Sequence, residues 1–306
     1  MSKFLRAIIT LFVTIGISVA QTLIKAHDGA IRAIDVEGNI MVTAGDDGYI
    51  KVWNIEKKKE IIRIKSHAGS VYSVAINKRG FVASAGDDGL IKIWRLPTGK
   101  LFKTFRGHKE SVRTLTFSKY GKYMASADDL WEIRLWDAKD WTLISSLTGH
   151  EGWIFGMAFS PSGELLATAS KDNTVRLWAL DGSFKVLKGH TDYVYSVAFS
   201  PGGSLLISSG NDHKVIIWRV KDGKLLYKFK AHEGAVYTVD YSLNGRYIAT
   251  GGFDAKVKVW NTKGWTIYKV LNGHNGPVMA LKFSKDSKKL VSGDNMGYLI
   301  FWDLEE

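Results

Sequence analysis

The sequence predicts an all-β protein built from seven copies of one four-stranded unit. Three observations lead to this prediction. A histidine after a small residue recurs seven times, a tryptophan follows each of these histidines after 26 to 28 residues, and the segments between them alternate between apolar and polar side chains. The composition agrees, because the 306 residues include 31 glycines and 11 tryptophans but only 4 prolines, as expected for strands joined by tight turns.

The repeat is regular enough to define the organisation of the chain. Its histidines lie 40 to 42 residues apart, at His27, His67, His108, His150, His190, His232 and His274. The tryptophans that follow them are Trp53, Trp94, Trp136, Trp178, Trp218, Trp260 and Trp302. Self-similarity at a fixed period of this length indicates a repeat architecture, in which each unit buries its apolar face against its neighbours.

Four strands are expected in each repeat, and the fifth repeat shows them well. Its expected strands are residues 193–199, 204–208, 214–218 and 225–230. Turn residues separate them, including a proline at Pro201 and a glycine at Gly223. Alternation of Val, Ile, Tyr and Phe with polar residues between such turns is the signature of strands exposed on one face.

These repeats, with their Gly-His and Trp marks, resemble the WD40 family over residues 21–306. The resemblance implies a seven-bladed WD40 β-propeller, with one four-stranded blade for each repeat. The expected blades are residues 27–65, 67–106, 108–148, 150–188, 190–230, 232–272 and 274–303. The last repeat ends too soon after Trp302 for a fourth strand, so residues 21–26 are expected to complete blade 7 and close the ring.

The first twenty residues have the layout of a secretory signal peptide. Lys3 and Arg6 precede an uncharged stretch at residues 7–20, which ends in small residues before Gln21. The expected location is therefore periplasmic or secreted, in a bacterium. Two alternatives remain, an uncleaved anchor that holds the propeller outside the cytoplasm and a buried N-terminal helix, although 14 apolar residues are short for a membrane span.

Every repeat also carries a His, a Ser or Thr and a Trp at fixed spacing, and five of the seven add an Asp, a set that could suggest a hydrolase triad. A catalytic site is built once, however, whereas this set recurs blade after blade. In the WD40 proteins that the chain resembles, these residues form a buried hydrogen-bond network. Apart from the histidines and tryptophans given above, the expected members are Thr43, Asp47, Ser84, Asp88, Ser126, Thr168, Asp172, Ser208, Asp212, Thr250, Asp254 and Ser292.

Two repeats depart from this pattern. Leu130 and Met296 stand where the other repeats have the aspartate, so the network is in doubt there and the turns are expected to take another shape. Leu130 and Trp131 are candidates for an exposed loop. No catalytic residue, cofactor or metal site is expected, because the chain has no cysteine and His213 is the one histidine outside the repeat.

Partner-binding positions are carried over from the family column by column. Two flank the first apolar residue of each inner strand and the third precedes the turn aspartate. The strongest candidates are Arg32, Tyr72, Arg113, Trp153, Phe155, Tyr193, Tyr195, Tyr237, Phe253 and Met279. The first three blades offer mainly charges and the later blades mainly rings, and Tyr, Trp, Arg and Met are enriched at interface cores. The alternative is that these rings pack against neighbouring loops.

The resulting hypothesis is a non-catalytic, monomeric scaffold that binds a protein or peptide outside the cytoplasm. An accessory subunit of a secreted or periplasmic respiratory or envelope enzyme complex is the alternative. The net charge of +12 also suggests a third hypothesis, in which the protein binds nucleic acid or an anionic surface. Much of this charge lies in runs such as residues 57–59, which are typical of solvated loops. Nucleic acid is therefore not expected as a partner, and membrane contact is expected only if residues 1–20 stay attached.

Overall fold

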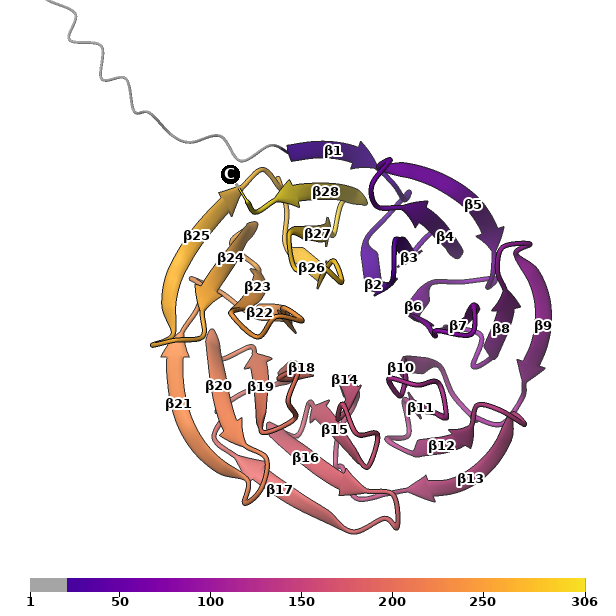
Figure 1. Cartoon of the computed structure of the whole chain (residues 1–306). Helices are drawn as coiled ribbons and strands as arrows, with labels where there is room; N and C mark the ends of the chain where they lie inside the picture. Colours follow the sequence, from indigo (N-terminus) through magenta and orange to yellow (C-terminus); the bar gives the residue numbers. More distant parts are fainter. Residues whose placement is uncertain (1–20, 306) are drawn as a thin grey trace, which may run out of the picture.

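The computed structural model describes residues 21–305, which form a ring of seven four-stranded antiparallel sheets (Figure 1). The all-β, seven-bladed propeller predicted from the repeats is confirmed. The expected signal peptide lies outside the described residues. Within the described part, no helix has the length and apolarity that a membrane crossing needs.

In six of the seven sheets the strand order follows the chain from the innermost to the outermost strand, and in blade 7 the outermost strand is β1. Blade 1 contains β2 (Ile31–Glu37), β3 (Ile40–Gly45), β4 (Tyr49–Asn54) and β5 (Lys59–Lys65). Blade 2 contains β6 (Val71–Ile76), β7 (Phe81–Gly86), β8 (Ile91–Arg95) and β9 (Lys100–Phe105). Blade 3 contains β10 (Val112–Phe117), β11 (Tyr123–Asp128), β12 (Ile133–Asp137) and β13 (Thr142–Leu147). Blade 4 contains β14 (Ile154–Phe159), β15 (Leu165–Ser170), β16 (Thr174–Ala179) and β17 (Phe184–Lys188).

The remaining blades repeat this arrangement. Blade 5 contains β18 (Val194–Phe199), β19 (Leu205–Gly210), β20 (Lys214–Arg219) and β21 (Lys224–Lys230). Blade 6 contains β22 (Val236–Tyr241), β23 (Tyr247–Gly252), β24 (Lys256–Asn261) and β25 (Thr266–Asn272). Blade 7 contains β26 (Val278–Phe283), β27 (Lys289–Asp294), β28 (Tyr298–Asp303) and β1 (Gln21–Lys25).

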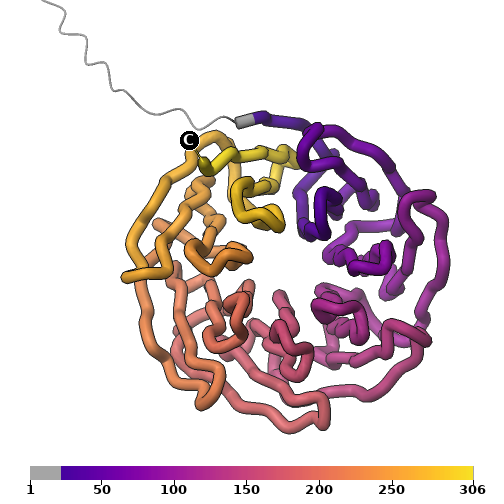
Figure 2. Tube along the Cα trace, viewed as in Figure 1, coloured from indigo at the N-terminus to yellow at the C-terminus, as the bar shows by residue number. Residues whose placement is uncertain are grey.

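Ring closure takes place in blade 7, as predicted. Strand β1 pairs antiparallel with β28, from Gln21 opposite Trp302 to Lys25 opposite Tyr298. The chain trace accordingly brings the two ends of the described segment side by side (Figure 2). Because β1 is the outermost strand of that sheet, its loss would leave blade 7 with three strands.

The apolar core lies between neighbouring blades rather than at the centre of the ring. One cluster, for example, joins Ile91 of blade 2 to Val112 and Trp136 of blade 3. Trp141 also belongs to this cluster, and its ring meets Phe81 edge-on with the centroids 5.2 Å apart. Trp141 stands in the turn between β12 and β13, with a positive φ of 59°.

Every inner strand contains a β-bulge at its second residue. The ladder with the next strand skips that residue in all seven blades, as between Ile31 and Ala33 in β2. A bulged residue has no cross-strand partner, and bulges re-aim side chains at strand ends. The seven residues at this position are Arg32, Tyr72, Arg113, Phe155, Tyr195, Tyr237 and Met279.

Candidate binding site at the channel mouth

The seven bulged residues gather around one end of the central channel, which we call the channel mouth. All seven line a cavity of about 190 Å³. Small residues from the next position of each strand surround it below, at Ala33, Ser73, Thr114, Gly156, Ser196, Thr238 and Ala280. The volume lies below the range of about 300–1,000 Å³ that is usual for small-molecule sites, so it suits an inserted side chain better than a whole metabolite.

Four rings along half of this mouth contact one another in a continuous row, with edge-on or tilted geometry, which we call the aromatic arc: Trp153, Phe155, Tyr195 and Tyr237. Their neighbouring ring centroids are 6.3, 5.2 and 5.1 Å apart. These separations lie in the range of favourable aromatic pairs. Gly156 lets the blades approach this closely, because a Cβ there would lie 2.7 Å from the carbonyl oxygen of Tyr195.

Arg113 extends the arc into the charged half of the mouth. Its guanidinium lies 4.2 Å from the ring centroid of Trp153 and 5.2 Å from that of Tyr72. The same guanidinium makes a bidentate ion pair with Asp129 of its own blade. The row of contacting groups therefore runs through five consecutive blades, from Tyr72 in blade 2 to Tyr237 in blade 6.

Blades 1 to 3 neutralise most of their charge at the mouth internally. Arg32 donates two hydrogen bonds to Asp46, at 2.7 and 2.8 Å. Tyr72 donates its hydroxyl proton to Asp87 at 3.1 Å. Blade 4 has Lys171 in the corresponding loop position, with its Nζ 4.5 Å from the Trp153 ring centroid. The two halves predicted from the sequence thus differ in chemistry as well as in composition.

Burial keeps the tyrosine hydroxyls of the mouth protonated. It raises the pKa of Tyr195 to about 12, and the hydroxyl donates to the Asn211 side chain at 3.3 Å. Burial also raises the pKa of Tyr237, and burial together with the Asp87 carboxylate raises the pKa of Tyr72. These phenols remain neutral donors over the whole physiological range.

Three candidates lie outside the lining of the cavity. Trp153 and Tyr193 stand directly before β14 and β18, at the rim, and the Tyr193 ring centroid is 6.4 Å from that of Phe155. Phe253 follows β23 and is 59% exposed. The structure therefore brings seven of the ten predicted residues to the cavity and leaves these three on the surface around it.

Charged residues at the floor of the cavity tie blades together. Lys282 donates to Asp240 at 3.0 Å, Asp240 accepts from the backbone of Phe283, and Asp35 accepts from the backbone of Ile76. Burial raises the pKa of Asp35, whereas the carboxylates of Asp240 and Asp35 outweigh burial and raise the pKa of Lys282. These hydrogen bonds link blade 6 to blade 7 and blade 1 to blade 2. They have a structural role and do not involve the seven bulged residues at the channel mouth.

The His–Asp–Ser/Thr–Trp network is present in all seven blades. Each histidine places Nδ1 2.6–3.0 Å from an aspartate oxygen and Nε2 2.6–2.9 Å from a Ser or Thr hydroxyl. Each tryptophan Nε1 donates to that hydroxyl at 2.8–3.1 Å. Since the carboxylate only accepts, Nδ1–H of a neutral imidazole donates to it, Nε2 then accepts from the hydroxyl, and the hydroxyl accepts from the indole, so every bond in the chain has a defined direction.

Blades 3 and 7, where the network was in doubt, keep it by using a different aspartate. Asp128 and Asp294 stand at the last residue of β11 and β27, two positions before Leu130 and Met296. Four of the other blades have glycine at this position, and at Gly45 a Cβ would lie 2.4 Å from His27 Nδ1. A side chain there points straight at the imidazole, which explains how a carboxylate from the strand end can replace one from the loop.

Sequence reasoning missed Asp128 and Asp294 although a signal was present. In both repeats an aspartate replaces the small residue at the end of the second strand, and the loop aspartate is absent only there. The released loop residues face solvent, with Leu130 55% and Met296 48% exposed. The expectation of an exposed Leu130 and Trp131 agrees with this geometry, since Trp131 is also exposed, at a positive φ of 67°.

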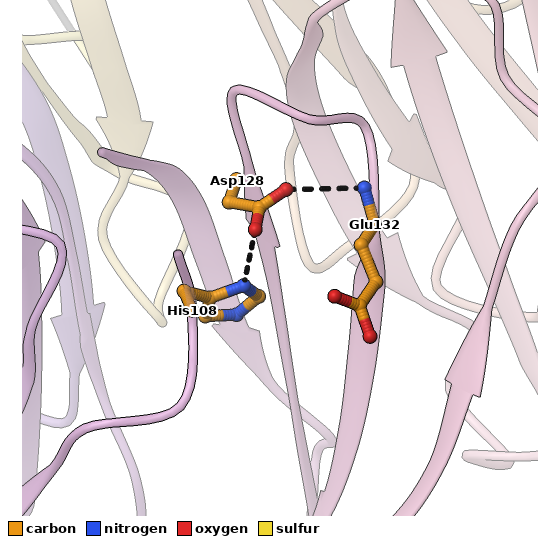
Figure 3. Close-up of side chains that lie close together, drawn as sticks. All are labelled: His108, Asp128 and Glu132. Carbon is orange, nitrogen blue, oxygen red and sulfur yellow. Dashed lines mark hydrogen bonds and ion pairs between the residues drawn. The ribbon is translucent and has the colours of Figure 1, made fainter. Parts of the chain in front are cut away.

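His108, Asp128 and Glu132 form the one group of side chains among the described residues that is close enough to be considered as a metal site (Figure 3). The nitrogen and oxygen atoms that could bind a metal lie within 4.8 Å of one another. His108 uses both ring nitrogens, on Asp128 and Ser126. The second oxygen of Asp128 accepts from two backbone amides of its turn, one of them that of Glu132. The Glu132 carboxylate accepts in turn from Arg134 and Ser146. These groups already satisfy one another, so the cluster is part of the blade's own hydrogen bonding.

The family model described as "WD domain, G-beta repeat" matches seven segments of the chain, residues 18–54, 58–95, 99–137, 141–179, 182–219, 223–261 and 265–303. The chain belongs to the WD40 family. Segments also match ribosome biogenesis protein erb1 of Botryotinia fuckeliana, 44% identical over 46 residues, which are 14% of this chain and 6% of that relative. The guanine nucleotide-binding protein subunit beta-like protein of Encephalitozoon cuniculi is 39% identical over 61 residues, 18% of each chain.

These matches extend over less than a fifth of either relative, and their names describe those proteins. What the matches share with this WD40 chain is the repeat. The seven matched segments begin near the outermost strand of one sheet and end with the third strand of the next. That offset reflects the ring closure already described, in which β1 belongs to blade 7.

Proposed function

We propose that this WD40 propeller is a non-catalytic scaffold that binds a protein or peptide at its channel mouth. The observation that carries the proposal is the row of contacting rings and guanidinium through five blades, because stable folding needs only one side chain at each bulge and no particular ring. Partly exposed Trp, Tyr and Arg at the centre of a surface are typical of interaction hot spots. The small cavity beneath them would accept one side chain of the partner.

The proposal is tested by comparing four immobilised proteins: the wild type, Trp153→Ala, Tyr195→Ala and the control Tyr227→Ala. Tyr227 is an exposed ring on the outer strand β21 of the same blade as Tyr195. A partner captured by the wild type and by the control is then titrated against all four. Affinity is expected to fall by about tenfold or more for the two variants in the arc, as for hot-spot residues.

Two results would contradict this proposal. Equal affinity of all four proteins would place the contact elsewhere. A large drop in melting temperature for Trp153→Ala and Tyr195→Ala would show that the rings are packing elements of the fold, as the alternative interpretation of these residues holds.

We also propose that the propeller works outside the cytoplasm. Support comes from the basic start, the uncharged stretch and the small residues before Gln21 in the sequence. Fractionation of the native cells followed by N-terminal sequencing tests this directly. A mature chain that begins at Gln21 in the periplasmic or secreted fraction is the expected result, whereas a cytoplasmic chain that retains residues 1–20 would contradict it.

A further inference from the structure

A second cavity, separate from the channel mouth, lies on blade 4. Its volume is about 410 Å³, and its lining comes mainly from the ends of β16 and β17 and the loop before β16. The lining residues used below are Asp172, Asn173, Arg176 and Lys188, together with Glu151. None of them lines the channel mouth.

Arg176 is the unusual member of this lining. It is only 8% exposed, yet it makes no hydrogen bond or ion pair with any other residue that the structure describes, and its buried Nε has no acceptor. The Oδ1 atom of Asn173 is also buried without a partner. Within residues 21–305, two of the five such side-chain atoms therefore lie in one cavity. A buried cation without an acceptor is costly, because its desolvation is not compensated.

The other blades show that this position normally has an acceptor. Five of the seven have Lys or Arg two residues before the repeat tryptophan. Lys51, Lys92 and Lys258 each donate to a backbone carbonyl of their own repeat. The acceptor is in each case the residue directly before the repeat histidine. Arg134 of blade 3 pairs with Glu132. Arg176 alone among these five is left without one.

The guanidinium of Arg176 is nevertheless held in a defined place. It lies 4.6 Å from the ring centroid of Phe184, and on another side it packs on Gly149, where a Cβ would lie 2.3 Å from Nη1. Gly149 has a φ of 147°, which other residues rarely adopt. A rigid guanidinium loses little conformational entropy when it binds a ligand, so the arrangement is preorganised.

The charges around Arg176 leave room for an anion. Lys188 lies at the rim of the cavity and makes no ion pair with any described residue. The Asp172 carboxylate already accepts hydrogen bonds from His150, Thr174 and the backbone of Glu151. Glu151 is exposed at the edge. Of these four groups, Arg176, Lys188 and the exposed Glu151 make no ion pair with a described residue, whereas the Asp172 carboxylate is fully hydrogen-bonded.

We propose that the blade 4 cavity binds an oxyanion, a carboxylate or a phosphate, with Arg176 as its anchor and Lys188 as a second cation at the rim. The planar guanidinium matches both groups in two-point hydrogen bonding. The buried Oδ1 of Asn173 is an acceptor, so it pairs only with a protonated oxygen of the ligand, such as that of hydrogen phosphate. The oxyanion belongs either to a free small molecule or to an acidic side chain of a bound protein, and the same experiment separates the two sources.

The test titrates the purified protein with inorganic phosphate and, separately, with an acetylated tetraglutamate peptide. The readout is the Nε–Hε NMR signal of Arg176, identified by its loss in Arg176→Gln, and affinity is measured by calorimetry. Saturable movement of this signal is expected with at least one probe. Arg176→Gln should weaken binding by about tenfold or more, the loss typical of charge-assisted hydrogen bonds.

Arg134→Gln is the matched control, because it removes the equivalent side chain of blade 3, where Arg134 already pairs with Glu132. The affinity of this variant for the probes should equal that of the wild type. Binding of phosphate alone would identify a free oxyanion as the ligand, and binding of the peptide alone an acidic protein side chain. No saturable shift with either probe, or unchanged affinity in Arg176→Gln, would overturn the proposal. If Arg176→Gln does not fold, Lys188→Gln and the wild-type signal still decide it.

Discussion

Blades 3 and 7 and the other five blades solve one bonding problem in two ways. In five blades an aspartate in the loop reaches back to the histidine, as Asp88 does to His67. In blades 3 and 7 an aspartate at the strand end lies beside the ring instead, as Asp128 does to His108. The comparison teaches that the position of the imidazole is determined by the fold, whereas the source of its carboxylate can vary.

The two solutions also differ in exposure. The Asp128 side chain is fully buried, whereas that of Asp88 is 20% exposed. After loss of the carboxylate, water can therefore reach the hydrogen-bond donors that Asp88 serves, but not those that Asp128 serves. The strand-end solution frees the loop tip as well, which places Leu130 and Met296 in solvent.

Blade 7 differs from blade 3 because its outermost strand, β1, comes from the other end of the chain. Removal of β1 is expected to cause the largest loss of stability. A chain that begins at residue 27 lacks β1 and exposes the edge of β28, including apolar surface now covered by Ile24 and Ala26. We expect the free energy of unfolding to fall by more than about 3 kcal/mol, since each buried aliphatic side chain contributes about 1.5–3 kcal/mol. Urea unfolding of this chain against one that begins at Gln21 measures the loss, and equal midpoints would contradict closure.

The next prediction removes the carboxylate from each kind of blade. Asp128→Ala leaves His108 Nδ1–H and two backbone amides of the turn without an acceptor in a buried site. We expect a loss of about 3 kcal/mol, against about 1–2 kcal/mol for Asp88→Ala, where water can enter. Urea unfolding of both variants gives the two values. A smaller loss for Asp128→Ala than for Asp88→Ala would show that burial does not separate the two solutions.

A double substitution converts one solution into the other. Asp128→Gly combined with Leu130→Asp gives blade 3 the glycine and loop aspartate of blade 1. The double variant is expected to recover about 1–2 kcal/mol of the stability that Asp128→Gly loses, a coupling that a double-mutant cycle isolates. Strictly additive effects would mean that the blade 3 loop cannot bring an aspartate to His108.

Acid should weaken the network in two steps. Burial lowers the pKa of His67, His150 and His232, so below the ordinary value of 6.5 the unfolded chain binds protons that the folded chain does not, and stability falls as the pH falls. The His27 hydrogen bond and charge outweigh burial and lower the pKa of Asp47 to about 2. Its stabilisation is present above 3.8, the ordinary value, and is lost as the pH falls through about 2.

Unfolding free energies measured from pH 8 to pH 2 test this order of events. A decline that begins near pH 6.5 and steepens below pH 4 is expected from these pKa values. The variant Asp47→Asn should lose less stability than the wild type in the acid step. Stability that rises as the pH falls from 6.5 to 5 would contradict the burial of neutral imidazoles.

The smallest effect is expected at the freed loop tips. Leu130→Ser and Met296→Ser replace exposed side chains outside the network, so each should change the unfolding free energy by no more than about 0.5 kcal/mol. Melting curves check this directly. A loss comparable to that of Asp88→Ala would show that the tips have a packing role.

Much of the architecture was predictable because it repeats. Spacing alone located seven histidines, seven tryptophans and the Ser or Thr between them, and the short last repeat indicated closure by residues 21–26. The position-by-position assignment failed at Asp128 and Asp294 because it assumed one source for the carboxylate in every blade.

The sequence by itself determined the number of blades, their strands and the aromatic character of blades 4 to 6, because alternation and turn residues act over short stretches of chain. Only the tertiary structure decided which aspartate meets which histidine, that rings from neighbouring blades contact one another in one arc, and that Arg176 has no acceptor among the described residues. Each of these depends on distances of a few ångströms between residues on different strands or blades. Such distances follow from the bulges and loop paths, and no spacing along the chain specifies them.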